Sequence, residues 1–336
     1  MVIALALLVQ AAAGPASPYP LAPSPVLDLH TLSHELRLGG YLSARQTLRR
    51  DTLTAIVNRA RLTAQVRPAP FAALRVQADF SATGLARADT VPAILLTDAY
   101  IQVVPPGTLD ARGPRALHPA VIVGQFRTPF SLEYLTPFSL LQTANRSQPI
   151  DRHTTRRDIG LLGQLAVGHA LTFTGALVNG EGSNRLTNPD GREMAIGRLT
   201  VFPLPRLAVA AKYLGQGGDH RWGYDARWID HGAIVEGEFL ARRGPFNSTT
   251  TVDARGGYLL ASYKPRPWLQ PVLKWERLRD TRTAGVTTTT TVLTYTTAGI
   301  NLLSAGESIR LLVEAIHKSE PGFTGTELEA QLLAIF

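Results

Sequence analysis

The chain has 336 residues, of which 45% are hydrophobic and 18% are charged, and its formal net charge is +8. The absence of cysteine excludes a disulfide framework and a thiolate metal site. A positive excess of this size can favour nucleic acid, an acidic surface or an anionic solute, so the placement of the charges must decide among them. Without segments of helical periodicity, this length favours either several soluble β domains or one large barrel.

The first residues predict a secretory leader. An apolar run at 2–9 is followed by an A-x-A site at 11–13, an arrangement typical of a cleaved signal peptide. The run is too short to span a bilayer. We therefore expect a signal peptide at 1–13, a loose Pro-rich lead-in at 14–33 and the folded chain at 34–336.

From residue 34 onward, apolar and polar side chains alternate in successive short segments. Leu74 and Val76, for example, interleave with Arg75 and Gln77. Alternation of this kind places successive side chains on opposite faces of a β-strand. In the clearest of these segments, all charged residues lie on one face of the strand. A membrane barrel requires this, since Arg or Lys facing lipid costs about 2–4 kcal/mol near the midplane. A soluble sandwich also alternates, so parity leaves two architectures open.

The connections distinguish these two architectures. Sixteen candidate strands can be counted, and short and long connections follow one another, with an exception at 105–118 where a short turn is due. The expected long connections include 47–54, 243–255, 278–291 and 319–326, and the threonine run at 287–291 indicates an exposed loop or the start of a strand. We predict an all-β fold: a transmembrane antiparallel β-barrel of about 16 strands, with short periplasmic turns and long extracellular loops. The last strand ends in Phe336, an aromatic end typical of a strand that closes an outer-membrane barrel, and we expect it to engage the barrel assembly machinery.

Several segments resemble a known family. They are TDAYIQVV at 97–104, VIVGQFRTPFSLEYLTP at 121–137, GINLL at 299–303 and the terminal Phe336. Together they are similar to the phosphate-selective porin O and P family of Gram-negative outer membranes, and the stretch G-x-F-x-x-P-F-S-L-E from Gly124 is the most specific part. The resemblance covers about residues 34–336. It implies a sixteen-stranded barrel, trimeric assembly and passage of small anions, with the third extracellular loop, at about 128–156, folded into the pore.

Charged side chains at the narrowest point set the selectivity of such a channel. Inward-facing acids and bases nearly balance along the whole chain, but bases are in excess in the first three strands and in the long loop. Arginine suits an oxyanion because its planar guanidinium donates two hydrogen bonds at once. The candidate anion pathway, led by Arg127 beside the loop, consists of Arg127, Arg59, Arg61, Arg75, Arg37, Arg45, Arg146 and Arg152. The candidate constriction-loop residues are Pro129, Phe130, Glu133 and Tyr134. For each arginine, pairing with a lumen carboxylate is the alternative.

The sequence thus predicts a porin of the bacterial outer membrane for passive diffusion of small anions such as phosphate. We expect no catalytic residues, no metal site and no cofactor, and we interpret the chain as not being an enzyme. The expected partners are small anionic solutes, outer-membrane lipid and further copies in a homotrimer, without nucleic acid. Three alternatives stay open: a general or other-solute porin with little ion selectivity, an outer-membrane barrel enzyme, and a secreted β-sandwich binder.

Overall fold

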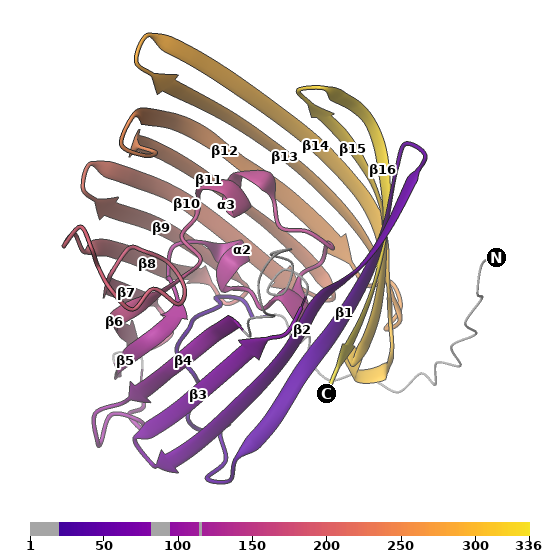
Figure 1. Ribbon diagram of the computed structural model, residues 1–336. Coiled ribbons are helices and arrows are strands. Elements are labelled where there is room, and N and C mark those ends of the chain that lie inside the picture. Colours follow the sequence, from indigo (N-terminus) through magenta and orange to yellow (C-terminus); the bar gives the residue numbers. More distant parts are fainter. Residues whose placement is uncertain (1–19, 82–94, 114–115) are drawn as a thin grey trace.

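The computed structural model describes residues 20–81, 95–113 and 116–336. Within these residues sixteen strands form one closed antiparallel barrel, in which sequence neighbours pair and β1 pairs with β16 (Figure 1). The strands are β1 (Arg37–Arg49), β2 (Thr52–Ala69), β3 (Ala72–Asp79), β4 (Leu95–Val103), β5 (Leu117–Arg127), β6 (Arg157–Val167), β7 (Leu171–Val178), β8 (Met194–Leu204), β9 (Leu207–Gln216), β10 (Asp219–Asp230), β11 (Ala233–Pro245), β12 (Thr250–Tyr263), β13 (Leu269–Ala284), β14 (Thr287–Leu303), β15 (Ile309–Glu320) and β16 (Phe323–Ile335). The predicted fold class is confirmed.

The two ends of the chain close the barrel. The seam between β1 and β16 runs in register from Tyr41 opposite Ile335 to Arg49 opposite Glu327. Beyond it, the Gly40 N–H donates to the Phe336 carbonyl oxygen (2.9 Å) and the Phe336 N–H donates back to that of Gly40 (3.1 Å). A Cβ atom on Gly40 would lie 2.2 Å from the Arg61 carbonyl oxygen and 2.8 Å from the Phe336 ring. Glycine is therefore required there for the last strand to close the sheet.

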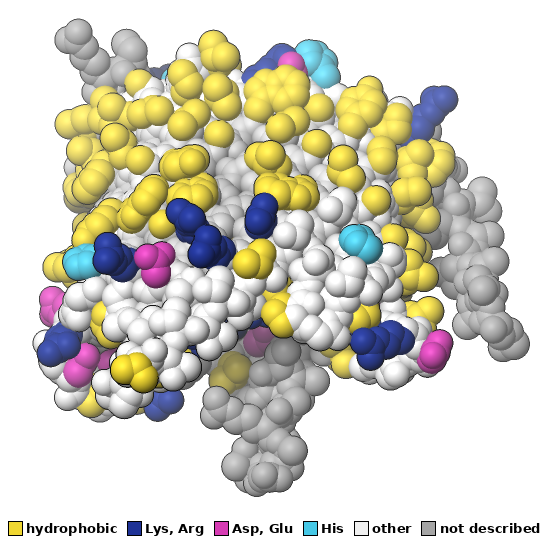
Figure 2. Space-filling view, turned by 90° about the horizontal axis from the view of Figure 1, so that it is seen from above, with side chains coloured by type: hydrophobic (Ala, Val, Ile, Leu, Met, Phe, Trp, Pro, Cys, Tyr) yellow, Lys and Arg dark blue, Asp and Glu magenta, His cyan; other side chains and the backbone are white. Residues whose placement is uncertain are grey.

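The wall has an apolar outer face and a polar inner face. In β16, Leu328 is 50% exposed on the outside, whereas Glu327 and Glu329, of the other parity, are 3% and 4% exposed. Figure 2 shows how hydrophobic side chains cover much of the outside. A closed antiparallel barrel with such an apolar belt is the form in which chains cross the bacterial outer membrane, so the predicted location is confirmed.

Four of the extracellular connections are shorter than predicted. The segments 47–54, 243–255, 278–291 and 319–326 were expected as long loops, but most of their residues belong to strands, and the turns between these strands occupy 50–51, 246–249, 285–286 and 321–322. Of the two alternatives for the threonine run at 287–291, the start of a strand is the one present: it begins β14 and pairs with β13, because β-branched side chains favour strands. The predicted exception between β4 and β5 is present as a long connection.

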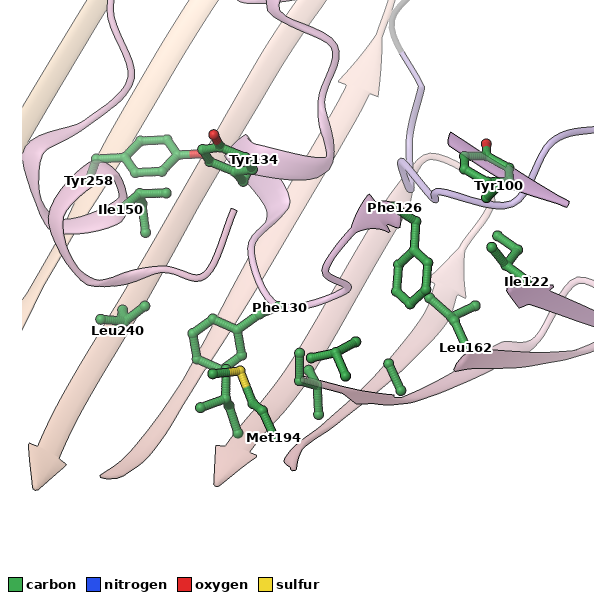
Figure 3. Packing of buried hydrophobic residues seen from close by; sticks show 14 of the residues in the cluster. Tyr100, Ile122, Phe126, Phe130, Tyr134, Ile150, Leu162, Met194, Leu240 and Tyr258 are labelled. Atoms are coloured by element: carbon green, nitrogen blue, oxygen red, sulfur yellow. The ribbon is translucent and has the colours of Figure 1, made fainter. Parts of the chain in front are cut away.

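The loop between β5 and β6 lies inside the barrel (Figure 1). It contains α2 (Leu132–Leu135), the 3₁₀ turn η1 (Phe138–Leu140) and α3 (Gln148–His153). No helix in the described part of the chain is long and apolar enough to cross a membrane. Phe130, Tyr134 and Ile150 from the loop join an apolar cluster with Leu240 and Tyr258 of the inner wall (Figure 3), so the loop is packed against the barrel like a core.

The lead-in is not loose where the structure describes it. Pro23 and Pro25 are buried, and Leu29 is only 1% exposed. Leu29 packs in a cluster with Ala73 and Val104 at the end of the barrel that holds the short turns. The predicted signal peptide at 1–13 lies outside the described residues.

Leu328→Arg should hinder folding into a bilayer, because an arginine facing lipid near the midplane of a barrel costs about 2–4 kcal/mol. Thr324→Arg is the matched control, since Thr324 lies on the same face of β16 close to its extracellular end, where the cost falls to about 0–1 kcal/mol. Urea titration of protein folded in vesicles measures both free energies of unfolding. Equal values for the two variants would show that Leu328 does not face lipid.

Candidate functional site

Buried charges fix the loop to one side of the barrel. Glu133 in α2 accepts hydrogen bonds from Lys274 Nζ of β13 (3.0 Å) and from the Ser147 N–H (2.8 Å). Ser131 Oγ donates to Glu238 Oε2 of β11 (3.0 Å). Breaking a buried pair by removing one partner costs about 3–5 kcal/mol, so these contacts hold α2 firmly against β11 and β13.

The tip of the loop continues along the wall to the seam. The Ala144 N–H donates to Glu314 Oε1 of β15 (2.8 Å), and Asn145 Nδ2 donates to Glu329 Oε2 of β16 (2.6 Å). Arg45 of β1 donates to the side-chain oxygen of Asn145. Arg45, predicted as part of the anion pathway, thus anchors the tip of the loop.

The helix α3 contributes a buried histidine to the same packing. His153 Nε2 lies 3.3 Å from Asp280 Oδ2 of β13. Burial lowers the pKa of His153 to about 4, because the low dielectric disfavours the charged form more than the neighbouring carboxylate favours it. The histidine is therefore neutral at physiological pH and serves as packing.

Behind the loop, the wall charges satisfy one another. Asp225 accepts from Arg198 Nη2 (2.6 Å) and from Lys212 Nζ (3.0 Å), and Lys212 also donates to Glu238. Arg227 Nε donates to Glu236 Oε2 (2.7 Å). These pairs match the alternative interpretation that a lumen arginine pairs with a wall carboxylate, and they leave little excess charge on this side.

Arginines gather with aromatic rings on the opposite side, where the loop faces β1 and β2. Arg59 stacks over Phe138 (5.0 Å from the guanidinium carbon to the ring centre), Arg61 over Tyr41 (5.8 Å) and Arg146 over Tyr134 (4.4 Å). We call Arg59, Arg61 and Arg146 the arginine cluster. Arg61 Nε also donates to Asp79 Oδ2 (2.8 Å). Cations are attracted to the faces of aromatic rings, so the rings hold these guanidinium groups at the edge of the loop.

A second basic group adjoins the cluster. Asp98 of β4 accepts from Arg157 Nε (2.6 Å) and Arg75 Nε (3.1 Å), while Arg127 donates to the Leu135 carbonyl oxygen (2.8 Å). The charge of Arg127 interacts with those of Arg157, Asp98, Arg75 and Arg61. Three arginines around one aspartate leave a local positive excess. Arg75 and Arg127 border a cavity of about 330 Å³, which Asp98 and the lead-in also line.

The lead-in crosses the lumen below the loop. The Pro20 carbonyl oxygen accepts from Arg227 Nη1 of β10 (2.7 Å), that of Pro25 from the Tyr100 hydroxyl of β4 (2.8 Å), and that of Leu29 from Arg67 Nη1 of β2 (2.6 Å). Strands β10 and β2 lie on opposite sides of the sixteen-stranded ring. The lead-in therefore bridges the barrel from wall to wall.

The structure brings together five of the eight predicted pathway arginines. Those beside the cavity or in the arginine cluster are Arg59, Arg61, Arg75, Arg127 and Arg146. Arg45 anchors the loop, Arg37 donates to the Thr31 carbonyl oxygen at the start of β1 (3.0 Å), and Arg152 donates to Gln148 at the exposed side of α3 (3.0 Å). Among the predicted loop residues, Pro129 precedes Phe130, and Phe130 packs near Lys212. Glu133 is the main anchor of the loop, and the ring of Tyr134 lies under Arg146.

Sequence reasoning missed the lead-in and the anchors of the loop. Gln102 holds the lead-in by accepting from the Leu27 N–H (2.7 Å) and donating to the Leu27 carbonyl oxygen (2.8 Å). The one local signal was the apolar alternation of Leu27 and Leu29 around Asp28. Partners separated by so many residues have no local signature in a single sequence.

Comparison with models of known protein families finds no match, and neither does a search of curated proteins. Solved structures do share the fold. OmpT of Vibrio cholerae, in a trimer form, has a TM-score of 0.62 at 10% identity, covering 90% of this chain and 100% of that chain. OmpF of Salmonella typhi has a TM-score of 0.64 at 12% identity (90% and 98% covered), and an anion-selective porin from Comamonas acidovorans has 0.60 at 9% identity (90% and 99% covered).

These similarities establish that the chain has the barrel fold of outer-membrane porins, as the sequence predicted. They do not identify the phosphate-selective porin O and P family, so that finer assignment stays a prediction.

One conclusion from the sequence is corrected. The chain was interpreted as not being an enzyme, but several of the matches are outer-membrane OmpT structures at 10–11% identity. A shared barrel at this identity fixes the fold without excluding an activity, and the exclusion is withdrawn.

Lys274→Met should destabilise the barrel by about 3–5 kcal/mol, because it leaves Glu133 buried without its cation. The double variant Lys274→Met with Glu133→Gln should recover much of this loss. Arg206→Met is the control, since it breaks an exposed pair with Asp230 that contributes about 0–1 kcal/mol. Unfolding of vesicle-folded protein in urea measures all three. Similar losses for Lys274→Met and Arg206→Met would contradict the anchoring role of Glu133.

Proposed function

We propose that the protein is an outer-membrane porin that admits small anions by passive diffusion. The observation that carries this proposal is the convergence of the arginine cluster with Arg75 and Arg127 on the side of the lumen that β2–β5 form. A barrel of sixteen strands is wide enough for an aqueous channel. Charged side chains at its narrowest part then decide which ions enter.

The mechanism is electrostatic attraction followed by release. Desolvated walls focus the field of clustered arginines and raise the local anion concentration. Each guanidinium offers a planar pair of donors that fits two oxygens of a phosphate or carboxylate. Asp79 and Asp98, which pair with Arg61 and Arg75, keep the attraction weak enough for the ion to leave. Phosphate is the anion that the sequence resemblance favours.

We further propose a homotrimer, with the C-terminal strand read by the barrel assembly machinery. A trimer form is described for the OmpT structure that shares the fold. The outer faces of the first strands also support self-association, because they carry exposed aliphatic side chains such as Leu42, Leu62, Val76 and Ile101. An apolar wall of this kind can pack against a second copy within the membrane.

Arg59→Gln and Arg127→Gln should each lower the preference for chloride over potassium. One charge about 4 Å from an ion in water contributes about 1 kcal/mol, so the permeability ratio should fall by up to about fivefold. Reversal potentials of single channels in a planar bilayer under a salt gradient measure the ratio. Arg112→Gln, in the exposed connection between β4 and β5, is the control and should change nothing.

The same recordings test phosphate. Added phosphate should reduce the chloride current through the unmodified channel and reduce it less in Arg59→Gln. An unmodified channel without preference between chloride and potassium, indifferent to phosphate, would instead identify a general porin.

Replacing residues 20–33 by a Gly/Ser linker of equal length should raise the single-channel conductance, because the replacement removes the bridge across the lumen and leaves a flexible coil. The matched control is a Gly/Ser replacement of 180–193, an equally long segment between β7 and β8. A conductance unchanged by the first replacement would show that the lead-in leaves the ion path open.

A further inference from the structure

On β12 and β13, some charged side chains lie on the outer face of the barrel instead of the inner face. Arg255, Arg277 and Arg279 are exposed on that face, next to inward-facing residues such as Glu276 and Asp280. Figure 2 shows Lys and Arg side chains on the outside, at the border between the hydrophobic surface and an uncoloured polar part. We call Arg255, Arg277 and Arg279 the outer arginines.

In the described part of the chain, no carboxylate forms an ion pair with these arginines, although Asp253 lies on the same face of β12. Arg255 lies directly opposite Arg279 in the sheet and Arg277 opposite Gly257, and like charges in opposite positions destabilise a sheet. Within the described residues, the outer arginines make no hydrogen bond, ion pair or ring contact. Three exposed cations held side by side without a partner favour an anion from outside the chain.

A groove of about 750 Å³ begins at the outer arginines and runs down the wall. Small residues form its floor, namely Ala226, Gly237 and Gly257 on three neighbouring strands. Larger side chains border it, namely Tyr224, Phe239, Leu259 and Trp275. The rings of Tyr224 and Phe239 stack with their centres 5.2 Å apart, which gives the groove one rigid side.

The groove lies at the depth where lipid chains meet their headgroups. Arg255 is five residues from the extracellular start of β12 at Thr250, and Arg279 is five residues from the end of β13 at Ala284. Outer positions beyond them are polar, such as Asp253 and Thr281, while those on the other side become apolar from Leu259 onward. The outer arginines therefore lie at the upper edge of the apolar belt.

We propose that this groove binds a lipid of the outer leaflet whose headgroup carries phosphate. One acyl chain lies over Gly237 and Ala226, and the phosphate accepts hydrogen bonds from the outer arginines. Charge argues against a second copy as the occupant: on the outer faces of the described strands the acids are Asp253, which lies beside the outer arginines, and Asp230, which already pairs with Arg206. A second copy would therefore bring three more arginines and only one unpaired carboxylate, Asp253. A phosphate lipid instead brings a negative charge for the arginines and an acyl chain for the groove.

The test uses Trp275 as a reporter in a Trp222→Phe, Trp228→Phe, Trp268→Phe background, with the full barrel in detergent. Phosphatidic acid with brominated acyl chains should quench Trp275 at concentrations at least about tenfold lower than a brominated galactosyl diacylglycerol, which lacks phosphate. Arg255→Ala with Arg277→Ala and Arg279→Ala should abolish this preference. The control, Arg112→Ala with Arg185→Ala and Arg266→Ala, removes the same charge from exposed loops and should keep it.

Ala226→Leu gives an independent check, because it fills the groove and leaves the outer arginines intact. It should weaken quenching by brominated phosphatidic acid. Equal quenching by the two lipids in the parent protein would overturn the proposal in favour of a non-selective lipid belt. Displacement of the lipid by an equal concentration of inorganic phosphate would also overturn the proposal, since the acyl chain would then contribute nothing to the affinity. The proposal would also be overturned if the variant lacking all three outer arginines kept its preference for phosphatidic acid and lost self-association, measured by light scattering. The outer arginines would then contact a second copy.

Discussion

The hydrocarbon core of a membrane offers no water to a backbone N–H or C=O, and this constraint determines the rest of the structure. Each such group must be bonded inside the protein, so the sheet has to close on itself. The closure is made by the paired residues of β1 and β16, and the reciprocal hydrogen bonds of Gly40 and Phe336 complete it. Once the sheet is closed, each strand has one face toward the lumen and one toward the lipid, and a charged side chain on the lipid face costs free energy. The lumen therefore collects nearly all of the charged side chains.

The crowded lumen then divides into two parts by how its charges are satisfied. On the side of β11–β16, acids such as Glu133 and Glu314 have cations or backbone N–H groups as partners, and these contacts fix the inner loop. On the side of β2–β5, arginines outnumber acids, and aromatic rings from the loop hold them. The same loop thus packs against the wall on one side and holds guanidinium groups with its rings on the other. The side of β2–β5 is basic because of where the charges lie, since acids and bases nearly balance over the whole wall.

The sequence predicted what depends on neighbours along the chain. Alternation set the parity of each strand, and the number of strands followed. Long-range contacts had no local signal, so the bridge from Pro20 to Leu29 and the anchors of the loop could not be predicted. The threonine run at 287–291, interpreted as an exposed loop or the start of a strand, forms the start of β14, because β-branched residues suit a strand. The outer arginines were visible as adjacent charges, Glu276 with Arg277 and Arg279 with Asp280, which no single parity can accommodate.

One buried arginine links the two segments that narrow the lumen. Arg227 donates Nη1 to the Pro20 carbonyl oxygen of the lead-in and Nη2 to Thr136 Oγ1 of the loop (2.8 Å), while Nε holds Glu236 on the wall. A guanidinium is a rigid fork, so the lead-in and the loop cannot shift independently where they meet it. Displacing the lead-in removes a partner from the side chain that supports α2. The positions of the lead-in and the loop in the lumen are therefore linked through the contacts of Arg227.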